Sequence, residues 1–267
     1  MQESVVWKIG GEAGFGIMSS GTMLAKTFSR SGYHVLTTND YPSLIRGGHN
    51  LITVRIAVGE FHAMNRGDNI LIALNKQTVE LHKDELLDGA LVVFDPRDFE
   101  WKTADFSKPV HCIALPMADI VRDAKGDPVM RNTVALGATM ALLGSEFELL
   151  AAVIRDQFKR KGDAVVNFNL SLAQHGYDHI RQHYSDISSM YLSKTQKTGT
   201  QLILNASEAV GIGAVRAGLK FAAIYPMTPI NSLISFLADH ERQLKVVYVQ
   251  PEDEIAGINM AIGASIA

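Results

Sequence analysis

Four glycines gather in residues 10–16, between an apolar stretch and a segment with helical spacing. Backbone N–H groups at the start of a helix point toward a bound anion, so such a turn can hold a phosphate group. The match to a dinucleotide-binding motif is flawed, because Ser19 replaces the third glycine and Asp40, the nearest acid for a ribose, lies beside a Tyr-Pro pair. Glycines are also needed simply to turn the chain, so a structural turn and a binding turn both stay open.

A second candidate loop contains an arginine and two glycines. Arg46, Gly47 and Gly48 place a cation beside free backbone donors, a combination that suits a phosphate or a carboxylate. The alternative is a solvated turn whose arginine pairs locally, because arginines and paired glycines are common in ordinary loops.

A proline-braced loop follows an apolar strand near the end of the sequence. In Tyr225-Pro226-Met227-Thr228-Pro229 the two prolines rigidify the loop, and the hydroxyl of Thr228 is held at a sheet edge where a ligand can reach it. On these five residues alone, a braced loop without a ligand is the favoured interpretation.

Three consecutive acids, Glu252, Asp253 and Glu254, open a predicted helix of small residues. Acids at a helix start are favoured by the helix dipole and by capping. These structural roles account for two of the three acids, which leaves one for chemistry.

Histidines and the single cysteine are further candidates. His175, His179 and His183 recur every four residues and could share one helical face as metal ligands. A solvated helical face is the favoured interpretation, because Gly176 weakens the helix and no acid motif of the zincin kind is present. Cys112 lies in an apolar run that predicts a buried strand, and one thiol excludes a disulfide framework and a self-contained iron–sulfur or cysteine–zinc site.

The composition limits the classes of function. With 267 residues, of which 47% are apolar, the chain is long enough for two ordinary domains with real cores. A net charge of −3 with 20% charged residues provides no basic stripe for nucleic acid. No apolar run is long enough to span a bilayer and no targeting segment is visible, so we expect no membrane partner and a cytoplasmic location.

Strands and helices alternate along the first part of the chain. We expect strands at 4–9, 33–37, 51–57, 70–74, 91–94 and 110–115, and helices at 17–28, 76–88, 132–143 and 146–159. This order predicts an α/β sheet that opens with a βαβ unit and is covered by helices.

A polar stretch separates this part from a second one. We expect a first domain over residues 1–187, a linker over 188–201 and a second, incomplete domain over 202–267. The second domain is predicted to contain a helix from 205, a strand at 221–224, a helix at 230–241, a strand at 245–249 and a helix from 252. Such a βαβα start cannot bury its faces alone.

Together these motifs resemble the 2-oxoacid:ferredoxin oxidoreductase family. Residues 9–16, 46–48 and 132–138 look like its γ domain. Residues 205–209, the Tyr-Pro-Met-Thr-Pro loop and the three acids look like the start of its α domain, in the order found where γ and α are fused. The resemblance covers nearly the whole chain. It implies a γ-type α/β domain followed by the start of a thiamine-diphosphate-binding, pyrimidine-type α/β domain.

The resemblance implies roles for the residues of the second domain. Thr228 would hydrogen-bond the carboxylate of the 2-oxoacid, and Tyr225 and Pro226 would line the thiamine site. Glu254 keeps the family's spacing to the Gly-Ala pair at 263–264 and would bond the aminopyrimidine ring of thiamine diphosphate.

In the first domain we predict that the two glycine-containing segments help bind coenzyme A, because they offer a cation and backbone donors for its phosphates. Its phosphates would be held by Gly11, Gly14 and Gly16 of the glycine turn. Arg46, Gly47 and Gly48 would supply a cation and further backbone donors.

The implied reaction is the oxidative decarboxylation of a 2-oxoacid, 2-oxoglutarate or pyruvate, to its acyl-CoA, with electrons passed to ferredoxin. In the family, Mg²⁺ and an iron–sulfur cluster belong to a β subunit, which implies that this chain works only with that partner, in an αβ or (αβ)2 assembly. Two alternatives remain: a nicotinamide-dependent dehydrogenase built on the glycine turn, and a non-catalytic γ-type module that binds coenzyme A or a nucleotide.

Overall fold

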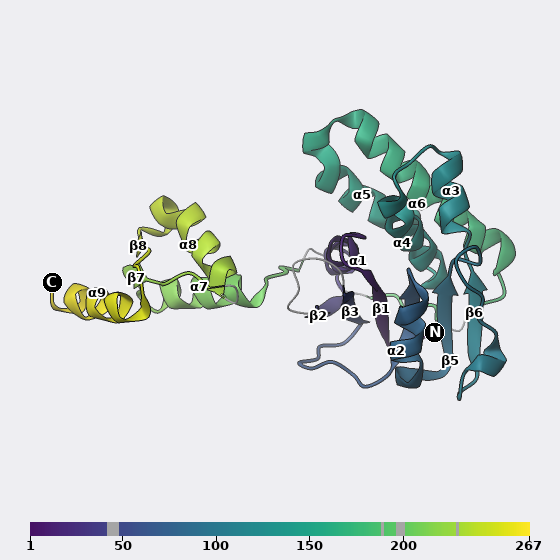
Figure 1. The fold of residues 1–267 in the computed structure, drawn as a ribbon, viewed down its shortest axis with the longest axis horizontal. Helices are drawn as coiled ribbons and strands as arrows, with labels where there is room; N and C mark the ends of the chain where they lie inside the picture. Colours follow the sequence, from purple (N-terminus) through teal and green to yellow (C-terminus); the bar gives the residue numbers. More distant parts are fainter. Residues whose placement is uncertain (42–47, 188–189, 196–200, 228–229) are drawn as a thin grey trace. The chain divides into compact units, whose positions relative to one another are not determined.

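The computed structural model describes residues 1–41, 48–187, 190–195, 201–227 and 230–267. Two compact units make up the chain, Met1–Gln201 and Leu202–Ala267 (Figure 1). Each unit is an α/β structure, so the predicted fold class is confirmed.

A six-stranded mixed sheet with the order β2-β3-β1-β4-β5-β6 forms the centre of the first unit (Figure 1). The strands are β1 (Ser4–Glu12), β2 (His34–Asp40), β3 (His49–Ala57), β4 (Asp68–Ala73), β5 (Leu86–Phe94) and β6 (Val110–Ala114). β1, β4, β5 and β6 are parallel, whereas β3 is antiparallel to both β1 and β2. The predicted opening βαβ unit is present, but β3 separates its two strands in the sheet.

Helices cover both faces of this sheet. They are α1 (Ile17–Arg30), α2 (Lys76–His82), α3 (Met117–Asp123), α4 (Arg131–Leu142), α5 (Phe147–Phe158) and α6 (Asp163–His183). Trp7, Ile9 and Ile72 point to the face where α1, α4, α5 and α6 build the larger core. Leu71 and Ala73 point to the opposite face, where Val79 of α2 joins a smaller core. Residues of one strand alternate between the two cores because successive side chains point to opposite faces.

α4 lies at the centre of the larger core and is buried on nearly all sides. A Cβ atom on Gly137 would lie 1.7 Å from the carbonyl oxygen of Ala173, and one on Gly176 would lie 2.0 Å from that of Val134. The two glycines therefore let the backbones of α4 and α6 touch. The expectation that Gly176 weakens the helix was wrong, because α6 runs unbroken through it and the close packing of α4 offsets its low helix propensity.

One predicted helix ends earlier than expected. The helix expected over residues 76–88 stops at His82, is followed by a 3₁₀ turn at Lys83–Glu85, and gives way to β5 at Leu86. Asn75 caps its start by accepting a hydrogen bond from the Thr78 N–H at 3.0 Å. The strand begins at Leu86 because that side chain is fully buried in the smaller core.

The second unit contains α7 (Ala206–Arg216), β7 (Phe221–Ala223), α8 (Asn231–Leu244), β8 (Val247–Val249) and α9 (Glu254–Ile266). β7 and β8 form a two-stranded parallel sheet. Asn205 and Glu208 cap α7 reciprocally, each side chain accepting from the other's backbone N–H. The core is small and includes Ala222, Leu237 and Val246.

Residues 190–193 belong to the segment expected as a linker, yet they pack in the first unit. Met190 and Leu192 are buried in the larger core. The N–H of Gln2 donates to the carbonyl of Tyr191 at 2.8 Å. Among the helices of the described ranges, none combines the length and apolar character that crossing a membrane requires.

Candidate functional site

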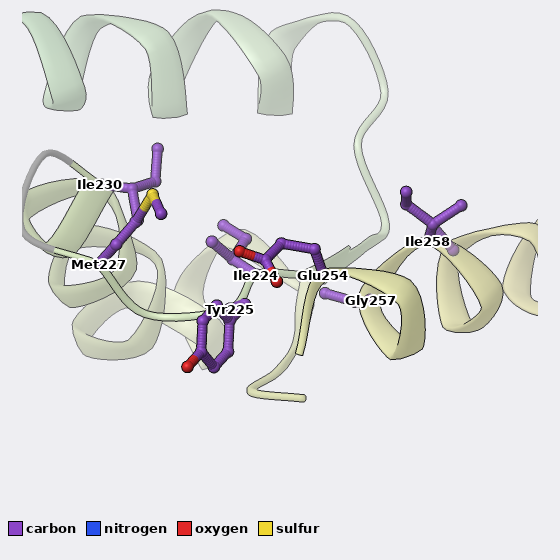
Figure 2. A pocket seen from close by; sticks show the side chains of 9 residues that line it. Ile224, Tyr225, Met227, Ile230, Glu254, Gly257 and Ile258 are labelled. Carbon is purple, nitrogen blue, oxygen red and sulfur yellow. The ribbon is translucent and has the colours of Figure 1, made fainter. Parts of the chain in front are cut away.

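A cavity of about 380 Å³ lies in the second unit, beside the loop after β7 and the start of α9. Its lining consists of Ala223, Ile224, Tyr225, Met227, Ile230, Glu254, Gly257, Ile258 and Ala261. Figure 2 shows the carboxyl group of Glu254 directed away from Ile258 and toward Ile224. Among the described lining residues Glu254 carries the one carboxyl group, and the rest of the wall is mostly apolar.

The parallel pairing of β7 and β8 places these residues together. Ala223 pairs with Val249, and the N–H of Ile224 continues the ladder by donating to Val249 at 3.1 Å. Parallel strands end at the same edge of a sheet, so the Tyr225 loop and the first turn of α9 meet there. Gly257 allows the first turn of α9 to pack closely against Pro251, because a Cβ atom at Gly257 would lie 3.3 Å from the Pro251 side chain.

The three acids at residues 252–254 have different surroundings. Asp253 caps α9, because its side chain accepts a hydrogen bond from the N–H of Ala256 at 2.7 Å. Glu252 precedes the cap and lies outside the cavity lining, and all three acids are exposed. Glu254 is the first residue of α9, and within the described part of the chain its carboxylate has no hydrogen-bond or ion-pair partner.

The other residues expected at this site differ in their placement. Tyr225 lines the cavity, whereas the half-buried Pro226 is not among the lining residues. Thr228 lies outside the described residues. Sequence reasoning missed Ile258 and Ala261, although their spacing of four and seven residues from Glu254 places them on the same helical face.

The glycine turn of the first unit is shorter than expected. β1 continues to Glu12, so Gly10 and Gly11 are strand residues rather than turn residues. A Cβ atom on Gly11 would lie 3.0 Å from Leu74, which indicates that this glycine permits close packing of the end of β4. The turn itself contains Gly14 and Gly16, with φ of 101° and 66°, a region that favours glycine.

Two other segments hold this turn. Gly48, with φ of 84°, accepts a hydrogen bond from the N–H of Ala13 at 3.2 Å, so the two glycine-containing segments of the sequence meet. The side-chain amide of Asn132 donates to the carbonyl of Phe15 at 3.0 Å. Arg46 and Gly47 lie outside the described residues.

A chain of polar side chains that the sequence did not reveal begins next to Gly48. His49 Nε2 lies 3.1 Å from His82 Nε2, and His82 Nδ1 lies 3.1 Å from Glu85 Oε2. Glu85 bonds the buried Lys8, whose Nζ lies 2.7 Å from Asp68 Oδ2. Burial lowers the pKa of His49, and the neighbouring His82 lowers that pKa further. Burial raises the pKa of Asp68 against the opposing effect of Lys8.

The three histidines of α6 have separate roles in the structure. His175 and His183 are exposed, and His179 Nε2 lies 3.2 Å from the carbonyl oxygen of Ala114. Across the described ranges no group of three or more His, Cys, Asp and Glu side chains is arranged to hold a metal ion. Cys112 lies in β6 as predicted, and burial raises the pKa of its thiol.

Comparison with known proteins identifies the family. A model of the family described as "Pyruvate ferredoxin/flavodoxin oxidoreductase" matches residues 6–179, well over half of the chain. The chain belongs to this pyruvate ferredoxin/flavodoxin oxidoreductase family. The thiamine-diphosphate-binding model of the same oxidoreductases matches residues 212–267. The resemblance inferred from the sequence motifs is therefore confirmed.

Relatives in this oxidoreductase family match nearly all of the chain. The 2-oxoacid:ferredoxin oxidoreductase 2 subunit alpha of Aeropyrum pernix is 23% identical, over 97% of this chain and 49% of the relative. The 2-oxoglutarate oxidoreductase subunit KorA of Mycobacterium tuberculosis is 25% identical, over 98% of this chain and 45% of the relative. The chain thus spans about half the length of these curated relatives.

Solved structures of the family have the same fold. The 2-oxoglutarate:ferredoxin oxidoreductase of Magnetococcus marinus, solved with 2-oxoglutarate, coenzyme A and succinyl-CoA bound, matches 99% of this chain and 46% of its own, with 28% identity and a TM-score of 0.91. The γ subunit of a keto/oxoacid ferredoxin oxidoreductase from Geobacter sulfurreducens matches 66% of this chain and 96% of its own, with 21% identity and a TM-score of 0.57. The expected γ-type fold of the first domain is confirmed.

Proposed function

We propose that this chain is part of an enzyme that oxidatively decarboxylates a 2-oxoacid to its acyl-CoA, uses thiamine diphosphate and passes electrons to ferredoxin. The observation that carries the proposal is the partner-free carboxylate of Glu254 in an apolar cavity at the carboxyl ends of two parallel strands. Ligands of α/β sheets bind at such edges. The match of residues 212–267 to a thiamine-diphosphate-binding model supports the same assignment.

The cavity has the chemistry that the aminopyrimidine ring needs. Ile224, Ile258 and Met227 offer apolar surface to a planar ring, and Glu254 offers a hydrogen-bonding carboxylate to a ring nitrogen. When bound, thiamine diphosphate supplies the carbon nucleophile that adds to the 2-oxo carbon of the substrate. Glu254 would hold the ring through a hydrogen bond to a ring nitrogen, and this bond would favour the form of the ring that accepts a proton.

Other residues of the Tyr225 loop complete this site in the proposal. Tyr225 lines the cavity and borders the cofactor, and Pro226 braces the loop. Thr228, next along the same loop, bonds the carboxylate of the 2-oxoacid. The substrate is 2-oxoglutarate or pyruvate, and the Magnetococcus marinus enzyme solved with 2-oxoglutarate supports the former.

We further propose that coenzyme A binds at the glycine turn. The first turn of α1 has no acidic residue and Gly16 provides no side-chain cap, so its backbone N–H groups remain available for a phosphate. Gly48 is hydrogen-bonded to this turn, and in the proposal its neighbours Arg46 and Gly47 add a cation and a further backbone donor. Gly14 and Gly16 shape the turn, and Gly11 permits the packing beneath it.

The complete enzyme needs a partner. The one cysteine of this chain cannot ligate an iron–sulfur cluster by itself. We propose that a β subunit holds the cluster, together with the Mg²⁺ that binds the diphosphate. The relatives named subunit alpha support an assembly of unlike subunits. We propose an αβ or (αβ)2 enzyme of the cytoplasm that reduces ferredoxin.

The test is an assay of the enzyme purified with the subunits that accompany it. We expect 2-oxoglutarate or pyruvate to reduce viologen only when coenzyme A and thiamine diphosphate are both present. Efficient NAD⁺ reduction without an iron–sulfur partner would instead support a nicotinamide-dependent dehydrogenase. Binding of coenzyme A without any turnover in the assembled complex would support a non-catalytic module.

A further inference from the structure

The chain of polar side chains from His49 to Asp68 joins five elements of the first unit. His49 opens β3, His82 ends α2, Glu85 ends the following 3₁₀ turn, Lys8 lies in β1 and Asp68 opens β4. Lys8 and Asp68 are buried, and Lys8 Nζ bonds Glu85 and lies 2.7 Å from Asp68 Oδ2. One end of the chain is therefore an ion-paired cluster, and the other end is a pair of imidazole rings.

The positions of the hydrogens on the two rings follow from Glu85. Burial opposes the ionisation of Glu85, but Lys8 and His82 outweigh burial and lower its pKa. An ionised carboxylate only accepts hydrogen bonds, so His82 Nδ1, 3.1 Å from Glu85 Oε2, carries a hydrogen. A neutral His82 then has its lone pair at Nε2, and His49 Nε2 donates its hydrogen to that lone pair across 3.1 Å.

The two rings meet head-on and have room for one hydrogen between them. Their centres lie 5.3 Å apart and their planes are inclined by 31°, with the two Nε2 atoms facing each other. His49 Nδ1 is buried, and no described residue forms a hydrogen bond with it. A further proton on the pair must go to this nitrogen, because His82 Nδ1 and the space between the two Nε2 atoms each already hold one. The buried N–H that results has no acceptor unless the ring of His49 moves.

A second pair of histidines lacks this constraint. His179 and His183 stack, with ring centres 4.4 Å apart and planes inclined by 22°. His179 Nε2 lies 3.2 Å from the carbonyl oxygen of Ala114, and His183 Nδ1 lies 3.0 Å from that of His179. A protonated imidazole can still donate to both carbonyls, so proton uptake leaves the contacts of this pair intact.

The ring of His49 lies where several backbone contacts meet. Its Cε1 atom would lie 2.9 Å from a Cβ atom on Gly10, so the ring packs directly on β1. His49 pairs with Glu12 in the sheet, and its neighbour Gly48 accepts a hydrogen bond from the N–H of Ala13 at 3.2 Å. A movement of this ring therefore loosens the start of β3 and the backbone next to the glycine turn.

The surrounding charges set the direction of the pH effect. In the described part of the chain, the charged groups that face the two rings are Asp40 of β2, Glu85 of the 3₁₀ turn, Lys8 of β1 and Asp68 of β4. Burial and His82 lower the pKa of His49, and Asp40 opposes them only in part. The contact is complete above about pH 6.5, the ordinary pKa of histidine, and is lost as the pH falls through the folded pKa.

We propose that the contact between His49 and His82 is a pH-sensitive latch. It ties the start of β3 to the end of α2 while His49 is neutral, and it opens when His49 takes up a proton. Opening loosens the strand pairing around Gly48 and leaves the rest of the sheet folded. The proposal goes beyond the proposed function, because it holds whatever ligand the glycine turn binds.

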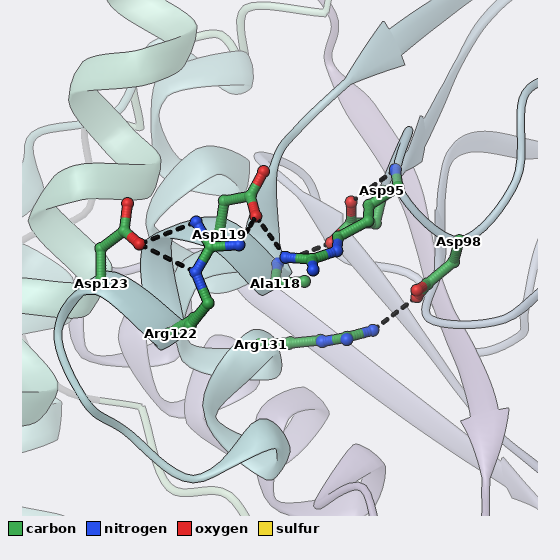
Figure 3. Close-up of polar contacts among 8 residues, drawn as sticks. Asp95, Asp98, Ala118, Asp119, Arg122, Asp123 and Arg131 are labelled. Atoms are coloured by element: carbon green, nitrogen blue, oxygen red, sulfur yellow. Dashed lines mark hydrogen bonds and ion pairs between the residues drawn. The ribbon is translucent and has the colours of Figure 1, made fainter.

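The test is amide hydrogen exchange of the assembled enzyme, followed by mass spectrometry at pH 7.5 and pH 5.5. Exchange in residues 8–13 and 48–52 is expressed relative to exchange in α3 of the same sample. Figure 3 shows that the ion pairs around this helix join arginines to aspartates, as in Arg122 with Asp123 and Arg131 with Asp98. In wild type the relative exchange should rise by up to about tenfold at pH 5.5, because opening takes up one proton.

Two variants and a matched control assign this rise to the latch. His49→Gln should change by less than about twofold between the two pH values, since a glutamine amide can donate to His82 Nε2 but takes up no proton. His62→Gln, at a histidine whose side chain is 85% exposed, should respond like wild type. If His49→Gln does not fold, His82→Ala replaces it. That variant should exchange at pH 7.5 about as fast as wild type does at pH 5.5.

The same measurements can overturn the proposal. A rise of wild-type size in His49→Gln would assign the pH effect to other groups, and a constant relative exchange in wild type would show that no latch opens. Faster exchange of residues 48–52 at pH 7.5 on addition of EDTA would place a metal ion, not a hydrogen, between the two nitrogens. Each of these results excludes a latch controlled by a proton on His49.

Discussion

At the scale of single residues, neighbouring acids at one helix start have separate roles. The side chain of Asp253 caps α9. Glu254 is the next residue, and its side chain lines the cavity without a hydrogen-bond or ion-pair partner among the described residues. A carboxylate bound to a cap is a poor proton carrier, whereas a free one beside apolar walls can bond a cofactor ring. The role proposed for Glu254 therefore depends on where the helix begins.

Changing Glu254 to Gln keeps the volume of the side chain but removes the charge that stabilises a protonated pyrimidine ring. We expect proton exchange at the thiazolium carbon in the assembled enzyme to slow by about a hundredfold to ten-thousandfold. The matched control, Glu252→Gln, should be close to wild type because Glu252 is equally exposed but lies outside the cavity lining. Equal exchange rates in wild type and Glu254→Gln would show that another group performs this role.

His49 predicts a dependence of stability on pH. Burial and the neighbouring His82 lower the pKa of His49 in the folded state. In the unfolded chain the imidazole is protonated near its ordinary pKa of about 6.5, so the unfolded state binds this proton at a higher pH than the folded state does. The contribution to stability is complete above about pH 6.5 and is lost as the pH falls through the folded pKa. We expect the urea midpoint of the first unit to decrease from pH 7.5 to pH 5.5.

Tryptophan fluorescence can follow this transition, since both tryptophans of the chain, Trp7 and Trp101, lie in the first unit. The variant His49→Gln should show a smaller decrease over the same pH range. A decrease of the same size in this variant would assign the pH dependence to other groups.

At the scale of elements, backbone contact between α4 and α6 shapes the larger core. Gly137 and Gly176 each face a carbonyl of the other helix. α4 also contacts the sheet, where Trp7 Nε1 donates to Thr139 Oγ1 at 3.0 Å. The start of α4 then reaches the glycine turn through Asn132 and the loop after β5 through Arg131. The packing of one helix thus positions contacts to two segments that are distant from it in the sequence.

Replacing Gly137 by Ala should destabilise the first unit. The added methyl group would lie 1.7 Å from a backbone oxygen, so the helices must separate, at a cost of about 1–3 kcal/mol or more. Gly59→Ala is the control, because a Cβ atom on Gly59 meets no atom within 4 Å. Urea unfolding followed by tryptophan fluorescence should show a lower midpoint for Gly137→Ala and little change for Gly59→Ala. A midpoint for Gly137→Ala at the wild-type value would contradict this packing.

At the scale of the whole molecule, the two candidate sites belong to different compact units. The glycine turn lies in Met1–Gln201 and the Glu254 cavity lies in Leu202–Ala267. α9 also exposes several apolar side chains, namely Ile255, Ile258, Ile262 and Ile266.

Because the two candidate sites belong to different units, we expect a substitution in one site to leave binding at the other site unchanged. We expect Glu254→Gln to leave the Kd for coenzyme A of the assembled enzyme unchanged, because Glu254 and the glycine turn proposed for coenzyme A belong to different compact units. Calorimetric titration of wild type and of this variant with coenzyme A measures this directly. A raised Kd for coenzyme A in Glu254→Gln would show that the two sites are coupled.

The sequence by itself determined the alternation of strands and helices, the family and the region of each candidate site. These features depend on local periodicity and on short motifs, such as the Tyr-Pro-Met-Thr-Pro loop and the glycine turn, which are contiguous in the chain. The choice of Glu254 among three acids also came from sequence spacing. The separate roles of Asp253 as the cap and Glu254 as a lining residue of the cavity became clear only from the structure, which shows the residue at which α9 begins.

Only the tertiary structure decided which distant residues meet. The antiparallel β3 between β1 and β2, the chain of side chains from His49 to Asp68, and the contact of Arg131 with Asp98 each join segments far apart in the sequence. The closeness of α4 and α6 likewise gave Gly176 a packing role that helix propensity alone had misjudged. Such contacts follow from strand order and helix packing, which local patterns do not encode.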